Sequence, residues 1–212
     1  MIRTFIADIS PLLDSQQYNI YYAKATKERK YKADRLKYVQ DKAQSIGVYS
    51  LHQKIKNELG LSESHVYNYS HSGNYVLVCI ADKSNIMIGC DIEAKRQMDI
   101  KVARRYYCDD EYSYVRSGNN KEEILNRFFR LWVLKESYMK AVRKGMGLST
   151  KAFEIAFNGE DKPILVKQPI EFPGRFYYKE FTCIEGINIA VCSTDGEFDD
   201  IKVKSLEGGA II

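Results

Sequence analysis

Hydrophobic positions along this chain follow two different spacings, and the two alternate in blocks. Apolar runs of strand length, rich in β-branched and aromatic residues, predict strands at 1–9, 75–81, 86–93, 153–157, 164–167, 176–184 and 187–193. Helical spacing of the apolar positions predicts helices within 26–58, 99–116 and 122–143, of which the last is the longest and most strongly amphipathic. Gly47 is expected to interrupt the first of these segments, and Gly145 and Gly147 to end the last.

The order of these elements favours one fold class. The residues from Asp82 to Asn85 have turn chemistry and are expected to join the strands on either side into a β-hairpin. Strands and helices come in blocks rather than in strict alternation, which is typical of an α+β fold with antiparallel sheets packed with helices. We expect two subdomains of similar layout, residues 1–98 and 99–212, with a break near residues 95–102.

The composition is that of an ordered globular protein. Of the 212 residues, 45% are hydrophobic and 28% charged, and disorder is not expected at these values. The N-terminus lacks the long apolar stretch of a signal peptide, and no window approaches 18 apolar residues, so we expect no membrane association and a cytoplasmic location. Five cysteines without a C-x-x-C pair predict neither a zinc site nor a disulfide framework.

Positive charge is concentrated near the N-terminus. The net charge of +4 is too small to predict a nucleic-acid-binding surface. Residues 24–42, however, hold eight Lys or Arg against three acids. Such a segment is either a solvated helix face or a patch that receives phosphate groups, and composition alone leaves both interpretations open.

Asp91 and Glu93 form the first candidate site. Two residues apart in a predicted strand, their side chains share one face. Two adjacent carboxylates repel unless a proton or a cation lies between them. Together with phosphate oxygens they would suit Mg²⁺, whereas two exposed acids at the end of a strand need no ligand.

Two further groups carry candidate chemistry. Glu136 and Lys140 are four residues apart in the long predicted helix, where they could serve a metal and a phosphate or form an ordinary surface ion pair. His71, within Ser70-His71-Ser72-Gly73, could donate to a phosphate from a loop of small residues or could belong to a plain polar turn.

In combination these motifs resemble the signature of the 4′-phosphopantetheinyl transferases of the two-domain, surfactin-synthetase-activating type. The strand motif G-[IV]-D-x-E reads GCDIE at 89–93, and the helix motif W-x-x-K-E-[SA]-x-x-K reads WVLKESYMK at 132–140. The RRYY segment at 104–107 and DEY at 110–112 are similar to the stretch between the two motifs. The resemblance is strongest over residues 66–150.

The resemblance implies a metal site and a reaction. Asp91, Glu93 and Glu136 would bind Mg²⁺, and Glu136 would help to deprotonate the attacking serine directly or through a water. Lys140 would contact the phosphates of coenzyme A and stabilise charge in the transition state. The serine belongs to an apo acyl, peptidyl or polyketide carrier protein, which accepts the phosphopantetheine arm while 3′,5′-ADP leaves. This explains why the chain shows no hydrolase triad.

The resemblance also implies contacts for coenzyme A. His71, with Ser70 beside it, would bind a phosphate of this substrate, in particular the 3′-phosphate. Arg29, Lys32 and Ser45 fall where the family has further contacts to the same phosphate. The two subdomains would be related by a pseudo-twofold axis, with coenzyme A in the cleft between them. Because this chain would carry both halves of the site, a monomer is expected.

Two departures from the family pattern concern the nucleotide. Gln44 stands where the pattern has arginine, so one charge is missing or is supplied by Lys42. The usual G-K-P loop before the histidine motif is replaced by LGLSESH at 59–65. A non-catalytic relative that only binds coenzyme A or a carrier protein therefore remains an alternative. A magnesium-dependent nuclease or phosphohydrolase is another, although it leaves the 132–140 helix motif unexplained.

Overall fold

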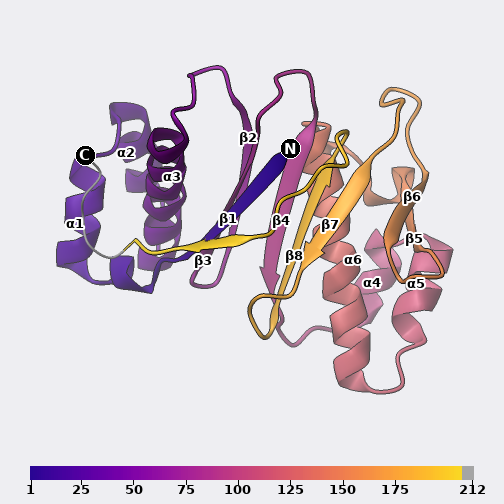
Figure 1. Cartoon of the computed structure of the whole chain (residues 1–212). Helices are drawn as coiled ribbons and strands as arrows, with labels where there is room; N and C mark the ends of the chain where they lie inside the picture. The colour runs from indigo at the N-terminus through magenta and orange to yellow at the C-terminus, as the bar shows by residue number, and fades with distance from the viewer. Residues whose placement is uncertain (207–212) are drawn as a thin grey trace.

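The computed structural model describes residues 1–206, in which two sheets pack face to face and carry helices on their outer faces (Figure 1). The larger sheet has the strand order β2-β3-β1-β9, formed by β1 Ile2–Asp8, β2 Val66–Ser72, β3 Tyr75–Ala81 and β9 Lys202–Lys204. Its pairs are antiparallel except for β1 and β9, which run parallel. The smaller sheet is antiparallel, in the order β4-β8-β7, with β4 Ile88–Ala94, β7 Tyr177–Phe181 and β8 Ile187–Ser193. A separate hairpin pairs β5 Glu154–Phe157 with β6 Pro163–Lys167.

The helices form the outer layers. The larger sheet carries the short 3-10 helix η1 Ser10–Leu13 and the helices α1 Ser15–Ala23, α2 Lys27–Asp34 and α3 Val39–Leu59. The other outer layer holds α4 Lys101–Tyr106, α5 Asp109–Arg116 and α6 Lys121–Ala141, followed by the 3-10 turns η2 Gly145–Gly147 and η3 Thr150–Ala152. None of the helices in residues 1–206 has the length and apolarity needed to cross a membrane.

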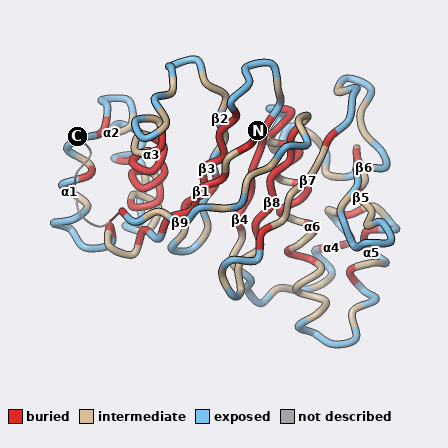
Figure 2. Tube along the Cα trace, viewed as in Figure 1, coloured by how far each residue is buried: buried red, intermediate tan, exposed pale blue. Residues whose placement is uncertain are grey.

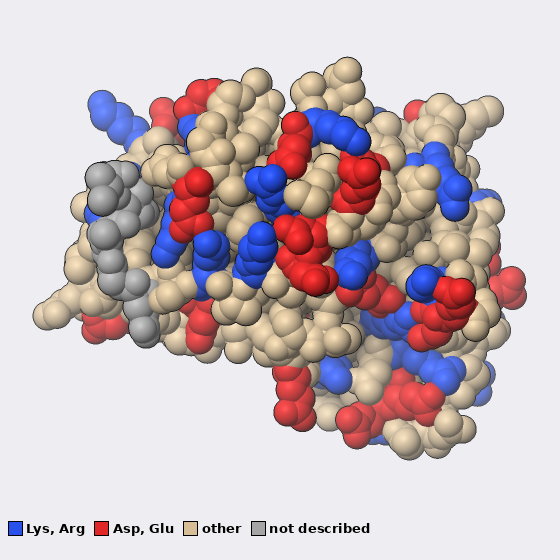
Figure 3. Space-filling model, viewed as in Figure 1, with Lys and Arg blue, Asp and Glu red and all other residues tan. Residues whose placement is uncertain are grey.

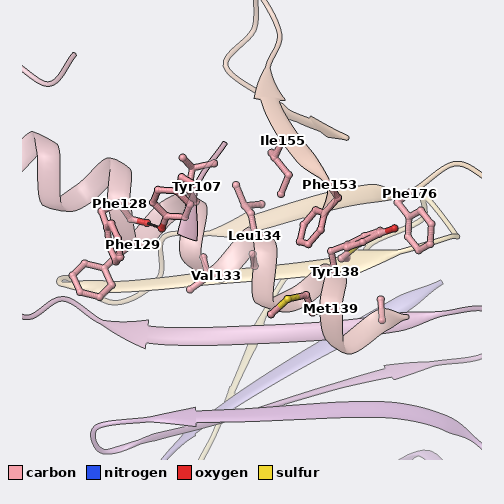
Figure 4. Close-up of a cluster of buried hydrophobic side chains, with 14 of the residues drawn as sticks. Tyr107, Phe128, Phe129, Val133, Leu134, Tyr138, Met139, Phe153, Ile155 and Phe176 are labelled. Atoms are coloured by element: carbon pink, nitrogen blue, oxygen red, sulfur yellow. Dashed lines mark hydrogen bonds between the residues drawn. The ribbon is translucent and has the colours of Figure 1, made fainter. Parts of the chain in front are cut away.

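Strand alternation distributes the apolar side chains between the layers. In β3, Leu77 and Cys79 face the smaller sheet, whereas Val76 and Val78 face the helices on the other side. Figure 2 shows that burial is concentrated in β1, β3, β4, β8 and α3. Because both faces of β3 are covered, residues 75–81 read as a continuous apolar run. A third cluster, built around α6, is drawn in Figure 4.

The α+β class with antiparallel sheets packed with helices is confirmed. The division into residues 1–98 and 99–212 stays a prediction, and two strand pairs cross it. β4 pairs with β8, and β9 returns to lie beside β1. On the face shown in Figure 3, acidic and basic side chains are interspersed, as the small net charge suggests.

The predicted hairpin across residues 82–85 is wrong. β3 pairs with β1 and β2, while β4 pairs with β8 in the other sheet. The actual hairpin joins β2 to β3 through Gly73, whose φ of 55° suits glycine. The chain does turn after β3, but Ile88, Cys90 and Ile92 then pack between the two sheets, which draws β4 into the second one.

Two helical details also differ from the prediction. Gly47 lies inside α3 and does not interrupt it, because its missing side chain makes room for Ile9. A Cβ atom at residue 47 would lie 2.4 Å from Ile9 Cγ2. The hydrophobic pattern did not predict α1, which begins after Asp14, whose side chain accepts hydrogen bonds from the amides of Gln16 and Gln17.

Candidate active site

Strand β4 and helix α6 make their closest approach at Gly89. A Cβ atom at this position would lie 2.1 Å from the carbonyl oxygen of Ser137 and 2.3 Å from the amide nitrogen of Ala141. No side chain fits between these backbones, so the glycine of the GCDIE motif is required by packing. The approach brings Asp91, two residues further along the same face of β4, next to the last turns of α6.

Asp91, Lys140 and Ser70 form a closed set of hydrogen bonds. Asp91 is only 5% exposed, and its Oδ1 accepts from Lys140 Nζ at 2.7 Å and from Ser70 Oγ at 2.8 Å. Lys140 Nζ also donates to Ser70 Oγ at 2.8 Å. Side chains from β2, β4 and α6 thus meet at one point.

Burial and charge act against each other in this set. Burial raises the pKa of Asp91, and the contacts with Lys140 and Ser70 offset that rise only in part. Burial by itself would lower the pKa of Lys140, but the neighbouring Asp91 carboxylate outweighs it, and the pKa of Lys140 is raised. Lys140 is therefore an ammonium group at neutral pH, held in a fixed position.

Glu93 is positioned by a residue that the sequence reasoning missed. Ser72 Oγ donates to Glu93 Oε2 at 2.8 Å and accepts from the Ala94 amide at 3.0 Å, while Arg96 Nη1 donates to the same carboxylate oxygen at 3.1 Å. Ser70 and Ser72 share one face of β2 because they are two residues apart in a strand. The role of Ser72 can be predicted from the sequence only if residues 66–72 are recognised as a strand rather than a loop.

Glu136 lies one helical turn before Lys140 and is half-buried. Its pKa is raised first by burial and then by the carboxylates of Asp91 and Glu93. Three acids therefore influence one another at this place. In residues 1–206, however, no group of three or more His, Cys, Asp or Glu side chains is arranged closely enough to hold a metal ion.

The three carboxylates nevertheless fit a divalent cation that takes some of its coordinating oxygen atoms from a bound ligand. Asp91 Oδ2 is buried and has no hydrogen-bond partner. This carboxylate oxygen is therefore left to accept a hydrogen bond or to bind a cation. Mg²⁺ usually binds one or two carboxylates together with phosphate oxygens and water rather than a closed protein cage. The carboxylates of Asp91, Glu93 and Glu136 suit this incomplete arrangement.

A pocket of about 830 Å³ contains the predicted phosphate contacts. Arg29 and Lys32 enter it from α2, Ser45 from α3 and His71 from β2. Arg29 Nη1 donates to Ser45 Oγ at 3.4 Å, so the two helices meet at this wall. The pocket lining holds three Lys or Arg against two acids, namely Arg29, Lys32 and Arg35 against Glu28 and Asp41.

His71 connects the pocket with the carboxylate site. It follows Ser70 in β2, so its side chain projects from the opposite face of the strand, toward the pocket. His71 is exposed, but desolvation by the protein atoms around the imidazole, and then the charge of Lys140, lower the pKa of His71. The imidazole is therefore neutral at neutral pH, and one of its ring nitrogens donates a hydrogen bond.

Gln44, which stands where the resembled family has arginine, has a structural contact. It is buried, and its Nε2 donates to the Gly73 carbonyl at 2.8 Å. Gln40 donates to the same carbonyl. The side chain thus fixes the turn that follows His71. Lys42 does not line the pocket among the residues described, so it does not replace the missing charge there.

We expect Gln44→Ala to lower the free energy of unfolding by about 1 kcal/mol, because the buried Gln44 side chain and its hydrogen bond to the Gly73 carbonyl are lost, while Gln40 still donates to that carbonyl. Urea titration followed by circular dichroism measures this. Gln17→Ala, at an exposed site of α1, is the matched control and should change stability by less than about 0.5 kcal/mol. Equal effects of the two substitutions on the free energy of unfolding would mean that the contact between Gln44 and Gly73 does not stabilise the protein.

Lys135, inside the WVLKESYMK motif, faces away from the site. It is buried, forms an ion pair with the buried Glu111 and donates to the Phe153 carbonyl at 3.0 Å. Glu111 also accepts from the amides of Cys108 and Ile155. This pair joins α6 to α5 and β5, so the lysine of the motif anchors the helix that carries Glu136 at the next position.

Comparison with known proteins gives a consistent result. The sequence profile of the 4′-phosphopantetheinyl transferase superfamily matches residues 87–192. The 4′-phosphopantetheinyl transferase gsp of Aneurinibacillus migulanus is 32% identical over 141 residues, which cover 66% of this chain and 56% of that protein. The transferase Sfp of Bacillus subtilis is 31% identical over 148 residues, which cover 69% of this chain and 63% of that protein. This chain thus matches about three-fifths of the length of these relatives. The solved holo-[acyl-carrier-protein] synthase of Helicobacter pylori, in complex with coenzyme A, is 22% identical, with a TM-score of 0.41 over 50% of this chain and 97% of that one.

Proposed function

We propose that this chain, which belongs to the 4′-phosphopantetheinyl transferase superfamily, transfers 4′-phosphopantetheine from coenzyme A to a serine of an apo carrier protein and releases 3′,5′-ADP. One observation carries the proposal. A pocket with a net positive lining opens beside a buried carboxylate–lysine set, and His71 and Ser70, adjacent in β2, connect the two. A phosphate-rich substrate in the pocket would extend its reacting phosphate toward Lys140.

The pocket would bind the nucleotide part of coenzyme A. Arg29, Lys32 and Ser45 present two cations and a hydroxyl at one wall, which suits a phosphate monoester. The neutral His71 would donate one hydrogen bond to the same 3′-phosphate. On the other face of β2, Ser70 would keep Lys140 directed toward the pyrophosphate.

Asp91, Glu93 and Glu136 would hold Mg²⁺. When bound, the ion would neutralise charge on the pyrophosphate. The ammonium of Lys140, fixed by Asp91, would stabilise the negative charge that grows on the phosphate oxygens as the bond to 3′,5′-ADP breaks. Glu136 would accept the proton of the attacking serine, directly or through a water, and burial beside two other acids strengthens it as a base.

Intact mass spectrometry of apo carrier proteins tests the proposal. Acyl, peptidyl and polyketide carriers are incubated with this protein, coenzyme A and Mg²⁺, and a gain of one phosphopantetheine mass that EDTA abolishes is expected. Carriers whose acceptor serine is replaced by alanine are the control. Coenzyme A binding without transfer would favour a non-catalytic relative. Release of phosphate from coenzyme A without a carrier would favour a phosphohydrolase.

His71→Ala should raise the KM for coenzyme A at least about tenfold, because one donor to a charged group is lost. The KM for dephospho-coenzyme A, which lacks the 3′-phosphate, should change much less. Steady-state transfer to one carrier, with each substrate varied in turn, measures both constants. Equal effects on the two substrates would mean that His71 does not contact the 3′-phosphate.

The remaining expectations belong to the same proposal. A monomer suffices if the phosphate pocket and the carboxylate set, both present in one chain, form the complete site. Sedimentation at the concentrations used in the assay tests this. A cytoplasmic location stays a prediction.

A further inference from the structure

Helix α6 ends in a cap that is usually built on glycine. The Lys144 amide donates to the Met139 carbonyl at 3.1 Å, and the Arg143 amide donates to the Lys140 carbonyl at 3.1 Å. This pair of bonds is the Schellman motif, whose central residue adopts the left-handed conformation. That residue here is Arg143, with a φ of 56°. A side chain at this position lowers stability relative to glycine.

The stability lost at Arg143 is not recovered by contacts of its side chain. Arg143 is exposed, and within residues 1–206 its guanidinium makes no hydrogen bond or ion pair. A residue that strains the backbone without making a contact in the free protein is best explained by a contact made with something else.

Two neighbours of Arg143 are also exposed side chains with few contacts. Lys144 is exposed, and its Nζ lies 6.0 Å from the centroid of the Phe172 ring. Met146 is 71% exposed, a value that Val203 equals and Ile170 exceeds among the large apolar side chains described. Methionine and arginine are enriched in protein interfaces. We call Arg143, Lys144 and Met146 the α6 tip.

The α6 tip lies beside the reacting groups. Arg143 follows Lys140 by three residues, and Lys140 reaches Asp91 and Ser70. None of the three tip residues lines the phosphate pocket among the residues described. The thioether of Met146 has no charge and no hydrogen-bond donor for a phosphate group. The tip therefore suits a protein surface better than it suits coenzyme A.

We infer that the α6 tip is the docking surface for the protein that presents the acceptor serine. Two exposed cations without acidic partners require acidic side chains on that protein, and Met146 requires an apolar recess between them. This inference rests on the proposed function, because it assigns the site of contact for the carrier protein in that reaction.

Arg143→Gly separates binding from structure. Glycine suits the left-handed cap, so the melting temperature should stay the same or rise. The KM for the carrier protein should rise about tenfold, the effect of losing an arginine that contributes strongly to an interface, and the KM for coenzyme A should stay within about twofold. A purely structural role for Arg143 would move neither constant. Met146→Ala should also raise the KM for the carrier.

Two exposed residues of other regions serve as controls. Val203, 71% exposed on β9, and Lys162, on the β5–β6 hairpin, should tolerate alanine without any change in the KM for the carrier. An unchanged KM for the carrier in both Arg143→Gly and Met146→Ala would overturn the docking surface while the proposed function stands. If only the KM for coenzyme A rises, the docking surface is overturned, and the α6 tip contacts coenzyme A instead. No transfer by the unmodified protein to any carrier would remove the proposed function and this surface together.

Discussion

Replacing Glu136 with glutamine is expected to reduce transfer at least about a thousandfold while the protein folds normally. Glutamine keeps the shape of the side chain but cannot accept the serine proton, and it removes one negative charge from the proposed cation site. Burial, and then repulsion by Asp91 and Glu93, raise the pKa of Glu136 in the unmodified protein, and the substitution removes this unfavourable charge. The free energy of unfolding should therefore stay the same or increase. Transfer rates at saturating coenzyme A and carrier, together with thermal unfolding, test both statements.

Glu122→Gln is the matched control for this experiment. Glu122 lies on the same helix, in its exposed first turn. Its replacement should leave the transfer rate within about twofold of the original value, since isolated surface charges contribute little. Substantial activity in Glu136→Gln would remove Glu136 from the proton transfer and from the proposed cation site.

Replacing Gly89 with alanine is expected to have the largest effect on stability. The added Cβ would meet backbone atoms of α6, 2.1 Å from the Ser137 carbonyl oxygen and 2.3 Å from the Ala141 amide. Backbone atoms cannot rotate away as a side chain does, so β4 and α6 must separate. We expect a loss of about 3 kcal/mol in the free energy of unfolding, at the upper end of the cost of overpacking. Activity should fall as well, because Asp91 and Lys140 are carried by these two elements.

Gly159→Ala provides the comparison for Gly89→Ala. A Cβ at residue 159 would meet no atom within 4 Å, and its backbone does not require glycine. This substitution should change the free energy of unfolding by less than about 0.5 kcal/mol. Urea unfolding of the two variants measures the difference. Similar stabilities would show that α6 and β4 tolerate a wider separation than the packing indicates.

The local sequence predicted most of the secondary structure for simple physical reasons. Apolar runs such as residues 75–81 form strands because both of their faces are buried. The helical pattern of residues 122–143 forms α6, observed at 121–141, because its apolar side chains belong to the buried cluster of Figure 4. The pattern failed at Gly47, since the glycine that looks like an interruption makes room for Ile9, a residue distant in the chain.

The motif residues, in contrast, were interpretable only in combination. A D-x-E strand and an i,i+4 Glu–Lys pair are weak signals separately, and the resemblance to a family gave them roles. The structure brings Ser70, Asp91 and Lys140 within hydrogen-bonding distance and collects Arg29, Lys32, Ser45 and His71 around one pocket. Those roles remain proposals, but the proximity of the residues is a feature of the fold.

What the sequence alone determined about this protein is local: most of the elements, the fold class and the residue types available for chemistry. Each of these depends on spacing within one segment, where side-chain direction follows directly from helix or strand geometry. Only the tertiary structure decided which strands pair, and in particular that β4 pairs with β8 rather than with β3. It also decided that Ser72 positions Glu93, that Lys135 points into the core, and that Arg143 occupies the cap of α6. These outcomes depend on contacts between segments far apart in the chain, which are selected by the burial of whole faces and leave no periodic signal within any one segment.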